Sequence, residues 1–584
     1  MALRHAESLG QDPFRVMESE GENKVVSLPE AVARYVRPGM TVHAGNDANA
    51  LLWQLLRQFW GQKAQFTMVI AVLQGFGFNL IHGGLVKKVI TSNCSDVFLT
   101  PGPSPIVQRA YKEGRVEFEN WSLYTHLQRL MAAALGLPFL PTTSLVNSTM
   151  QAENSASFAT IPNPFDEREG VAVVKALAPD ISLVHAWAAD AYGNCIPMFG
   201  DAESVWGAKA STLGAIVSAE NVVSTDFLRR YAPMVKIPGH IVKAVVHVPF
   251  GAHPSGMSNP ILEGMEAYQH DASFLADLRA ASREPQSLDA WLKEWVLDSD
   301  SHEKYLDKLG SQRLTSLKGW VSDGPSTARK AFTPSTSDYS PVEMMVVAAA
   351  RKIKEHIRQK GYRILLTGIG TAGLAAWMAY YWLRHDGYLV DLLVGSGYYG
   401  YTPRPGSPNM FDVANEMTSK MVTDSLDVYG VLMKEGSSMA ALGAGQVDKF
   451  GNVNSTKLTQ DLYLTGSGGG NDAASTAGEL MVIAPQSARR FLDQVFYVTM
   501  PGQRVKSVVS TLGIFEKLNG AQELSLTAYF PTTKGATEAE KMQDIQANCG
   551  WRLKVADKLQ QISPPTSDEL GMLRALDPKK EFLG

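Results

Sequence analysis

Residues 362–395 read "YRILLTGIGTAGLAAWMAYYWLRHDGYLVDLLVG" and contain one complete strand–helix–strand pattern. The apolar runs at 362–368 and 388–395 have the length of buried strands, and the segment between them has the length and composition of a buried helix. Two strands joined through a helix are typically parallel neighbours in one sheet. This stretch therefore predicts an α/β fold built on a mainly parallel sheet.

The same alternation of strands and helices occurs in two parts of the chain. Strand-like runs such as "MTVHAG" and "FTMVIAVL" alternate with helical segments such as "LPEAVARYV" before residue 285. A charged, serine-rich stretch with only short helical pieces follows, and its composition is typical of a connector. The predicted divisions are a tail at 1–24, a domain at 25–285, a connector at 286–340, a second domain at 341–560 and a tail at 561–584.

A short repeat links the two predicted domains. "HAWAADAYGN" (185–194) and "GAGQVDKFGNVN" (443–454) share Asp-x-aromatic-Gly-Asn, beginning at Asp190 and Asp448. The match indicates either two related halves or only a shared type of turn, because turns select Asp, Gly and Asn in any fold.

Composition and charge narrow the class of protein. The 584 residues are 45% hydrophobic and 19% charged, as in globular proteins, and the net charge of −4 offers no basis for binding nucleic acid or an anionic membrane. Three scattered cysteines form neither a disulfide framework nor a metal site. The N-terminal stretch is polar and no uncharged run is long enough to span a membrane. We expect a cytoplasmic protein without a metal.

Two glycine-rich loops could bring backbone N–H groups close to a ligand. "LLTGIGTAGLAAWMA" (365–379) has GxGxxG spacing, but no acidic residue ends the next strand as a dinucleotide site requires. "LTGSGGGNDAAS" (464–475) could form an oxyanion hole or a pantetheine cradle, or simply a strained turn. The candidate binding glycines are Gly368, Gly370, Gly373, Gly466, Gly468, Gly469 and Gly470, and Asn471 is a candidate side-chain donor.

Several longer motifs resemble the family I CoA-transferases of the glutaconate CoA-transferase type. "HGGLVKKVITS", "WSLYTHLQRLMAAALGLPFLPTTS" and "VVHVPFGAHPSG" resemble the α-like half of that family, and "GYYGYTPRPGSP", "GAGQVDKFGNVNST" and "TGSGGGNDAAS" resemble its β-like half. The resemblance implies two similar open α/β domains fused in one chain, with the active site between them. It also implies an acyl-CoA substrate, coenzyme A as part of that substrate with no permanently bound cofactor, and a monomer or homodimer.

In the transferases of this family, a glutamate begins a Glu-x-Gly motif before the segment that matches "YYGYTPRPG", and it attacks the thioester. A carboxylate suits this step because the acyl anhydride that it forms stays activated. Here the motif reads "VGSG", with Gly395 in place of the glutamate. Ser396 is a candidate nucleophile, although strand alternation would turn it to the opposite face and a plain turn serine is the alternative. The glycine predicts open space for water or a larger acyl group.

Relatives without this glutamate perform other acyl-CoA chemistry, which includes ring-opening hydrolysis and decarboxylation. In "RVEFENWSLYTHLQRL" (115–130), Glu119 matches the base of the ring-opening relatives and shares a strand face with Glu117; a surface or helix-capping glutamate is the alternative. We therefore expect an acyl-CoA hydrolase or C–C bond-cleaving enzyme, with Glu119 as base and Asn471 and the glycine loops as donors. The alternatives are a CoA-transferase and an inactive acyl-CoA-binding protein.

Overall fold

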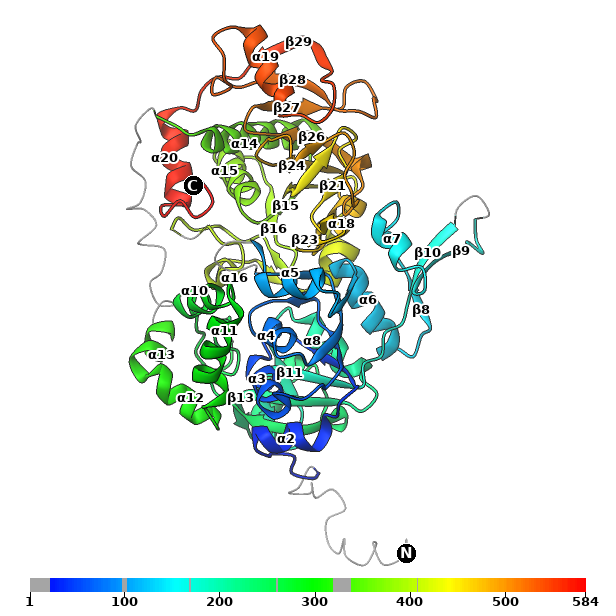
Figure 1. The fold of residues 1–584 in the computed structure, drawn as a ribbon. Coiled ribbons are helices and arrows are strands. Elements are labelled where there is room, and N and C mark those ends of the chain that lie inside the picture. Colours follow the sequence, from blue (N-terminus) through cyan, green and yellow to red (C-terminus); the bar gives the residue numbers. More distant parts are fainter. Residues whose placement is uncertain (1–20, 97–101, 167–169, 259–260, 319–337, 407) are drawn as a thin grey trace, which may run out of the picture.

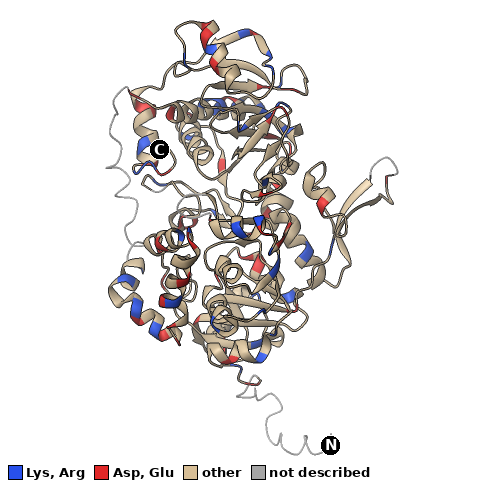
Figure 2. Ribbon diagram, viewed as in Figure 1, with Lys and Arg blue, Asp and Glu red and all other residues tan. Residues whose placement is uncertain are grey.

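The chain folds into two α/β halves that stack on one another (Figure 1). The computed structural model describes residues 21–584 except 97–101, 167–169, 259–260, 319–337 and 407. Acidic and basic residues are interspersed over both halves (Figure 2). Within the described ranges, no helix combines the length and apolar character that a bilayer crossing needs.

The first half contains an eight-stranded sheet in the order β14-β13-β11-β1-β2-β4-β7, with β12 beside β11. All its pairings are parallel except that of β12. Its strands are β1 (Thr41–Ala44), β2 (Phe66–Val69), β4 (Val86–Thr91), β7 (Glu117–Asn120), β11 (Ile181–Asp190), β12 (Cys195–Pro197), β13 (Ala215–Val223) and β14 (Val242–His247).

The second half contains a ten-stranded sheet in the order β18-β17-β16-β15-β19-β24-β26-β27-β28-β29. The five strands from β16 to β26 are parallel. They are β15 (Ile364–Thr367), β16 (Asp391–Leu393), β19 (Ser438–Gly443), β24 (Glu479–Ile483) and β26 (Val505–Val509). Helix α15 (Thr371–His385) joins β15 to β16, so the strand–helix–strand prediction for 362–395 is confirmed.

Successive strand residues face two different cores in the second half. Leu365 packs with α15 and with α14 (Pro341–Lys360), whereas Leu366 packs on the opposite face with Tyr429 and with α18 (Gly470–Thr476). Because side chains alternate along the strand, the two faces of the sheet belong to two different cores, and one of these faces carries α18.

The two sheets share a central order of five parallel strands. β2-β1-β11-β13-β14 of the first half corresponds to β16-β15-β19-β24-β26 of the second. The prediction of two similar, mainly parallel-sheet domains in one chain is therefore confirmed.

The repeated aspartate turn is the same in both halves down to its hydrogen bonds. Asp190 Oδ1 accepts from the backbone N–H groups two and four positions on, at 3.0 and 2.9 Å, and Asp448 Oδ1 does so at 2.9 and 2.9 Å. The asparagine of each turn accepts a further bond from a distant N–H, that of Gly239 at 2.9 Å or Gly502 at 2.8 Å. Because a local turn alone does not fix a distant partner, the shared network indicates related halves.

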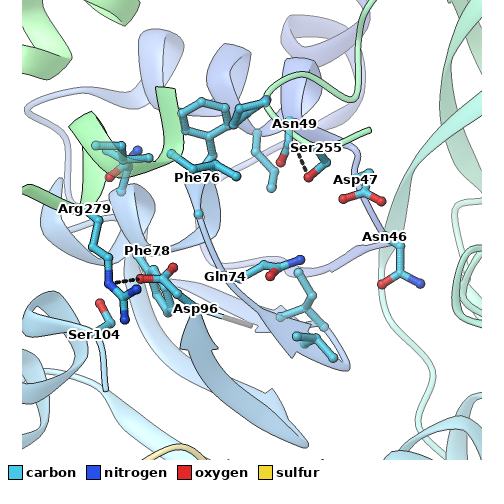
Figure 3. A pocket seen from close by; sticks show the side chains of 18 of the residues that line it. Asn46, Asp47, Asn49, Gln74, Phe76, Phe78, Asp96, Ser104, Ser255 and Arg279 are labelled. Carbon is cyan, nitrogen blue, oxygen red and sulfur yellow. Dashed lines mark hydrogen bonds and ion pairs between the residues drawn. The ribbon is translucent and has the colours of Figure 1, made fainter. Parts of the chain in front are cut away.

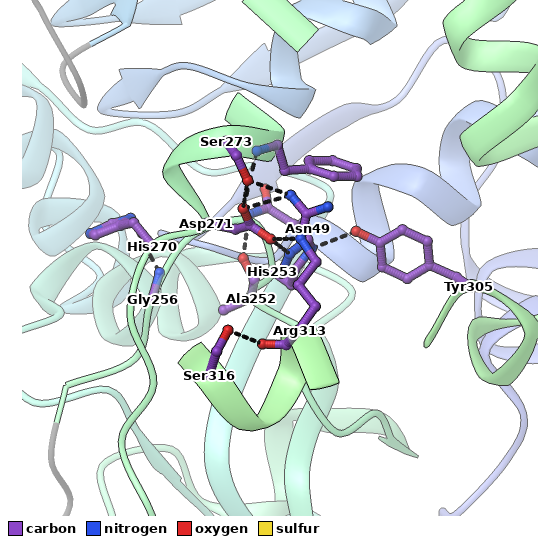
Figure 4. Close-up of polar contacts among 11 residues, drawn as sticks. Asn49, Ala252, His253, Gly256, His270, Asp271, Ser273, Tyr305, Arg313 and Ser316 are labelled. Carbon is purple, nitrogen blue, oxygen red and sulfur yellow. Dashed lines mark hydrogen bonds and ion pairs between the residues drawn. The ribbon is translucent and has the colours of Figure 1, made fainter. Parts of the chain in front are cut away.

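Four helices follow the first sheet: α10 (Ala272–Ala281), α11 (Pro285–Leu292), α12 (His302–Leu309) and α13 (Ser311–Lys318). Phe274 and Leu288 join the core of the first half. Arg313 Nη2 donates to Asp271 Oδ1 at 2.8 Å, and His253 Nε2 lies 3.1 Å from Asp271 Oδ2 (Figure 4). The helical pieces expected within 286–340 are thus present up to Lys318 but pack as part of the first half. The other predicted boundaries stay predictions.

Candidate functional site

The loop that contains Gly466 and Gly468 joins the two halves. The Gly468 N–H donates to the Ser92 carbonyl at 2.9 Å, and the Gly468 carbonyl accepts from the Leu123 N–H at 2.9 Å. A Cβ atom on Gly466, whose φ is 117°, would collide with the Ser92 carbonyl. These glycines therefore permit close backbone contact between the halves, and the Gly468 N–H is already paired. Ligand binding by this loop stays a prediction.

Asn471 links the same two halves through its side chain. Its Oδ1 atom accepts from the Leu145 N–H and its Nδ2 atom donates to the Thr499 carbonyl, both at 2.8 Å. The neighbouring Asp472 accepts from the Tyr124 N–H at 3.0 Å. The Asn471 amide is fully buried, so the observed bonds account for a structural role, and its role as a donor to substrate stays a prediction.

The turn at Gly395 differs from the open space that the sequence predicts. A Cβ atom on Gly395 would come within 3.0 Å of the Tyr429 hydroxyl oxygen, closer than real Cβ atoms approach. The space where a side chain would begin is therefore filled. The Ser396 hydroxyl oxygen is buried and has no hydrogen-bond partner in the described part of the chain, so no described base is placed to activate it.

Glu119 is held by three donors. Lys88 Nζ lies 2.6 Å from its carboxylate, Trp121 Nε1 donates at 2.7 Å and Arg129 Nη1 at 3.0 Å. Burial raises the pKa of Glu119, but Lys88 and Arg129 outweigh it and lower the pKa overall. Glu117 binds the same Lys88 at 2.9 Å, as expected for two residues on one strand face. A lowered pKa makes a weaker base, and the catalytic role of Glu119 stays a prediction.

The first glycine loop lies at the start of α15. Gly370 has a φ of 80°, and a Cβ atom on Gly373 would lie 2.5 Å from the Gly368 carbonyl oxygen. The Phe582 ring of the C-terminal segment lies 3.6 Å from the Cβ position of Gly370. Tight packing explains these glycines, and their role in binding CoA stays a prediction.

A cavity of about 780 Å³ lies between the halves. Apolar residues such as Trp206 and Met234 line it, together with three carboxylates, Asp201, Glu416 and Asp424. Asp201 Oδ1 accepts from the Ser204 N–H and from Asn46 Nδ2, each at 3.0 Å, as the cap of α8 (Ala202–Ala210). Its Oδ2 atom is buried and unpaired among the residues that the structure describes.

Two of the three cavity carboxylates have pKa values raised to near neutral pH. Burial raises the pKa of Asp201 to about 7 and that of Glu416 to about 7. Groups with such pKa values exchange protons readily at neutral pH and suit general acid–base catalysis. The sequence did not single out either residue, because "GDAES" reads as an ordinary helix cap and Glu416 belongs to no motif.

A narrower pocket lies inside the first half (Figure 3). Asn46 and Asp47 lie at one end of it, and Arg279 pairs with Asp96 at 3.5 Å at the other. Asp47 adopts a φ of 58°, and desolvation raises its pKa to about 6. Since Asn46 also binds Asp201, this pocket adjoins one carboxylate of the larger cavity.

A further buried acid lies behind Asp201 in α8. Glu203 accepts from the Ala71 N–H just beyond β2, with His126 Nε2 at 3.6 Å and His43 Nε2 at 3.8 Å. Burial raises the pKa of Glu203 to about 8 and lowers the pKa of each histidine to about 3. Glu203 and both histidines are therefore neutral at moderately acidic pH.

Comparison with known proteins agrees with this architecture. Residues 25–247 match the family model described as Coenzyme A transferase. The chain is 31% identical over 315 residues to one subunit of the glutaconate CoA-transferase of Acidaminococcus fermentans, covering 51% of this chain and 95% of that protein. It is 25% identical over 308 residues to the cholesterol ring-cleaving hydrolase IpdA subunit of Rhodococcus jostii, covering 50% of this chain and 98% of that protein.

Among solved structures, the acyl-CoA transferase YdiF of E. coli O157:H7 shares the fold along most of the chain. The TM-score is 0.63 at 16% identity, with 93% of this chain and 95% of that chain covered. The fold, the shared motifs and the match to the glutaconate enzyme place this chain in the coenzyme A transferase family.

Proposed function

We propose that the chain is an acyl-CoA enzyme that does not transfer CoA through a covalent intermediate at residue 395, and that it hydrolyses its substrate or cleaves a C–C bond. The observation that carries this proposal is the turn at Gly395. The residue has no carboxylate, and the Tyr429 hydroxyl occupies the space into which one would extend. An acyl-glutamyl intermediate at this position requires both the carboxylate and the space.

The cavity between the halves supports water-dependent chemistry. Its volume of about 780 Å³ accommodates an acyl group together with water. Asp201 or Glu416 would take a proton from water, the hydroxide would add to a carbonyl carbon, and the bond to sulfur or carbon would break as the proton returns to the leaving group. Glu119 is the other candidate base. The similarity to a ring-cleaving hydrolase subunit supports this class of reaction.

Product analysis tests the proposal directly. The protein is incubated with a panel of acyl-CoA esters, with and without excess acetate, and the products are identified by mass spectrometry. We expect free CoA, or a CoA ester with a cleaved carbon skeleton, in equal amount with and without acetate. Protein-dependent formation of acetyl-CoA would instead establish CoA transfer. Stabilisation by CoA esters without any product over hours would indicate an inactive binding protein.

A further inference from the structure

The hydroxyl of Tyr429 lies between the turn at Gly395 and the glycine-rich loop that contains Gly469. Tyr429 belongs to a π-helical turn, η6 (Val428–Leu432), which follows α17 (Ser425–Asp427). A Cβ atom on Gly395 would come within 3.0 Å of this hydroxyl oxygen, and so would a Cβ atom on Gly469. Two glycines from separate loops thus make room for one hydroxyl group. Single π-helical turns often mark functional positions.

The hydroxyl has no hydrogen-bond partner among the residues that the structure describes, although Tyr429 is only 3% exposed. Buried tyrosine hydroxyls usually find a partner, because an unpaired polar group is costly to desolvate. A substrate atom at this position would supply the missing acceptor.

The hydroxyl also keeps its proton at neutral pH. Burial raises the pKa of Tyr429 above its usual value, and the nearby Asp472 carboxylate raises it further. The group can therefore donate a hydrogen bond but cannot act as an anionic nucleophile. A neutral donor is the kind of group that stabilises negative charge on a substrate oxygen.

We propose that Tyr429 is a catalytic residue whose hydroxyl donates a hydrogen bond to the carbonyl oxygen of the acyl-CoA substrate as that oxygen gains negative charge. The inference rests on the proposed function for its chemistry. The proton stays on the tyrosine and no covalent bond to the protein forms. The position that would otherwise hold a nucleophile is thereby converted into an oxyanion-binding site.

The kinetic test compares Tyr429→Phe with the wild type. Phenylalanine keeps the ring and its packing and removes only the hydroxyl, so we expect an unchanged melting temperature. We expect kcat to fall by about 10²- to 10³-fold, as when an oxyanion donor is removed elsewhere. Tyr124→Phe is the matched control, because the hydroxyl of this first-half tyrosine also contacts the second half. It lies 2.8 Å from the Cβ position of Gly430. We expect this control to keep kcat within about twofold.

A binding test separates this inference from the proposed function. It uses two stable CoA analogues: a ketone in which a methylene group separates sulfur from the carbonyl, and the matching thioether without a carbonyl. The wild type should bind the ketone about two- to tenfold more tightly than the thioether, and Tyr429→Phe should bind both equally. This comparison remains decisive if the wild type turns over no acyl-CoA, an outcome that counts against the proposed function alone. An unchanged kcat, or an unchanged preference for the ketone, in Tyr429→Phe would overturn the assignment.

Discussion

In both halves the central parallel strand, β11 or β19, is followed by the same aspartate turn, whereas the ends of the corresponding strands β2 and β16 differ. Beyond β2 the Ala71 N–H is bound by Glu203, a buried carboxylate of α8. Beyond β16 the chain turns at Gly395 against the Tyr429 hydroxyl. Ligands of open α/β sheets bind outside the carboxyl ends of the strands. The two halves therefore share a scaffold and differ in the groups that lie at the ends of corresponding strands.

The largest effect is expected at Asp201, the carboxylate that the first half contributes to the cavity between the halves. Asp201→Asn keeps the cap of α8 but removes the titrating group, so kcat/KM should fall by about 10²- to 10⁴-fold. In the wild type, the rate should rise with pH through about 7, because a base acts only when deprotonated. Steady-state kinetics from pH 5 to 9 measure both effects. Glu119→Gln is the comparison variant, and a larger loss there than in Asp201→Asn would identify Glu119 as the base.

The next effect tests the shared part of the scaffold. Asp190→Ala and Asp448→Ala each leave several partly buried donors unpaired, so each should lower the free energy of unfolding by about 2–4 kcal/mol. Because the two networks match, the two losses should agree within about 1 kcal/mol. Urea unfolding measures them, with Asp226→Ala, an exposed carboxylate, as a control of less than about 0.5 kcal/mol. A marked inequality would show that the turns have diverged in their contribution to stability.

The sequence predicts the scaffold better than the site for a physical reason. Strand periodicity and the Asp-x-aromatic-Gly-Asn turn act over a few residues, so the parallel strands, α15 and the repeat follow from local patterns. Tyr429 reaches Gly395 and Gly469 only through tertiary packing, and it lies in no glycine-rich or charged motif. Asp201 reads as a helix cap until the structure places it in the lining of one cavity with Glu416 of the second half. The pairing of Glu119 with Lys88 and Arg129 likewise depends on sheet order and helix packing.

A smaller effect is expected from restoring a carboxylate beside Tyr429. Gly395→Glu places a side chain against the tyrosine hydroxyl and should cost about 1–3 kcal/mol of stability through overpacking. The same change should cost about 1 kcal/mol less when combined with Tyr429→Ala, because the clash is removed. Gly436→Glu is the matched control, since nothing lies within 4 Å of its Cβ position. Additive costs in this double-mutant cycle would contradict direct contact between residues 395 and 429.

The smallest effect is a change of about 1 kcal/mol per pH unit in stability, with opposite signs in two buried clusters. Glu203 has a pKa of about 8 in the folded protein against an ordinary 4.5, so between these values the folded state keeps a proton that the unfolded chain releases. Its contribution therefore makes stability fall as pH rises through this window, by at most about 1.4 kcal/mol per pH unit.

Asp271 behaves in the opposite way. Burial raises its pKa, but hydrogen bonds from His253 and Arg313 outweigh burial and lower the pKa overall. Its stabilisation is therefore present above the ordinary aspartate pKa and is lost as pH falls below it. Urea unfolding at pH 3 to 8 should show a flatter dependence above pH 4.5 for Glu203→Gln and a flatter acid side for Asp271→Asn. If Glu203→Gln left the slope above pH 4.5 unchanged, the acid beside β2 would already be ionised in the folded protein, and the two strand ends would then differ in charge as well as in shape.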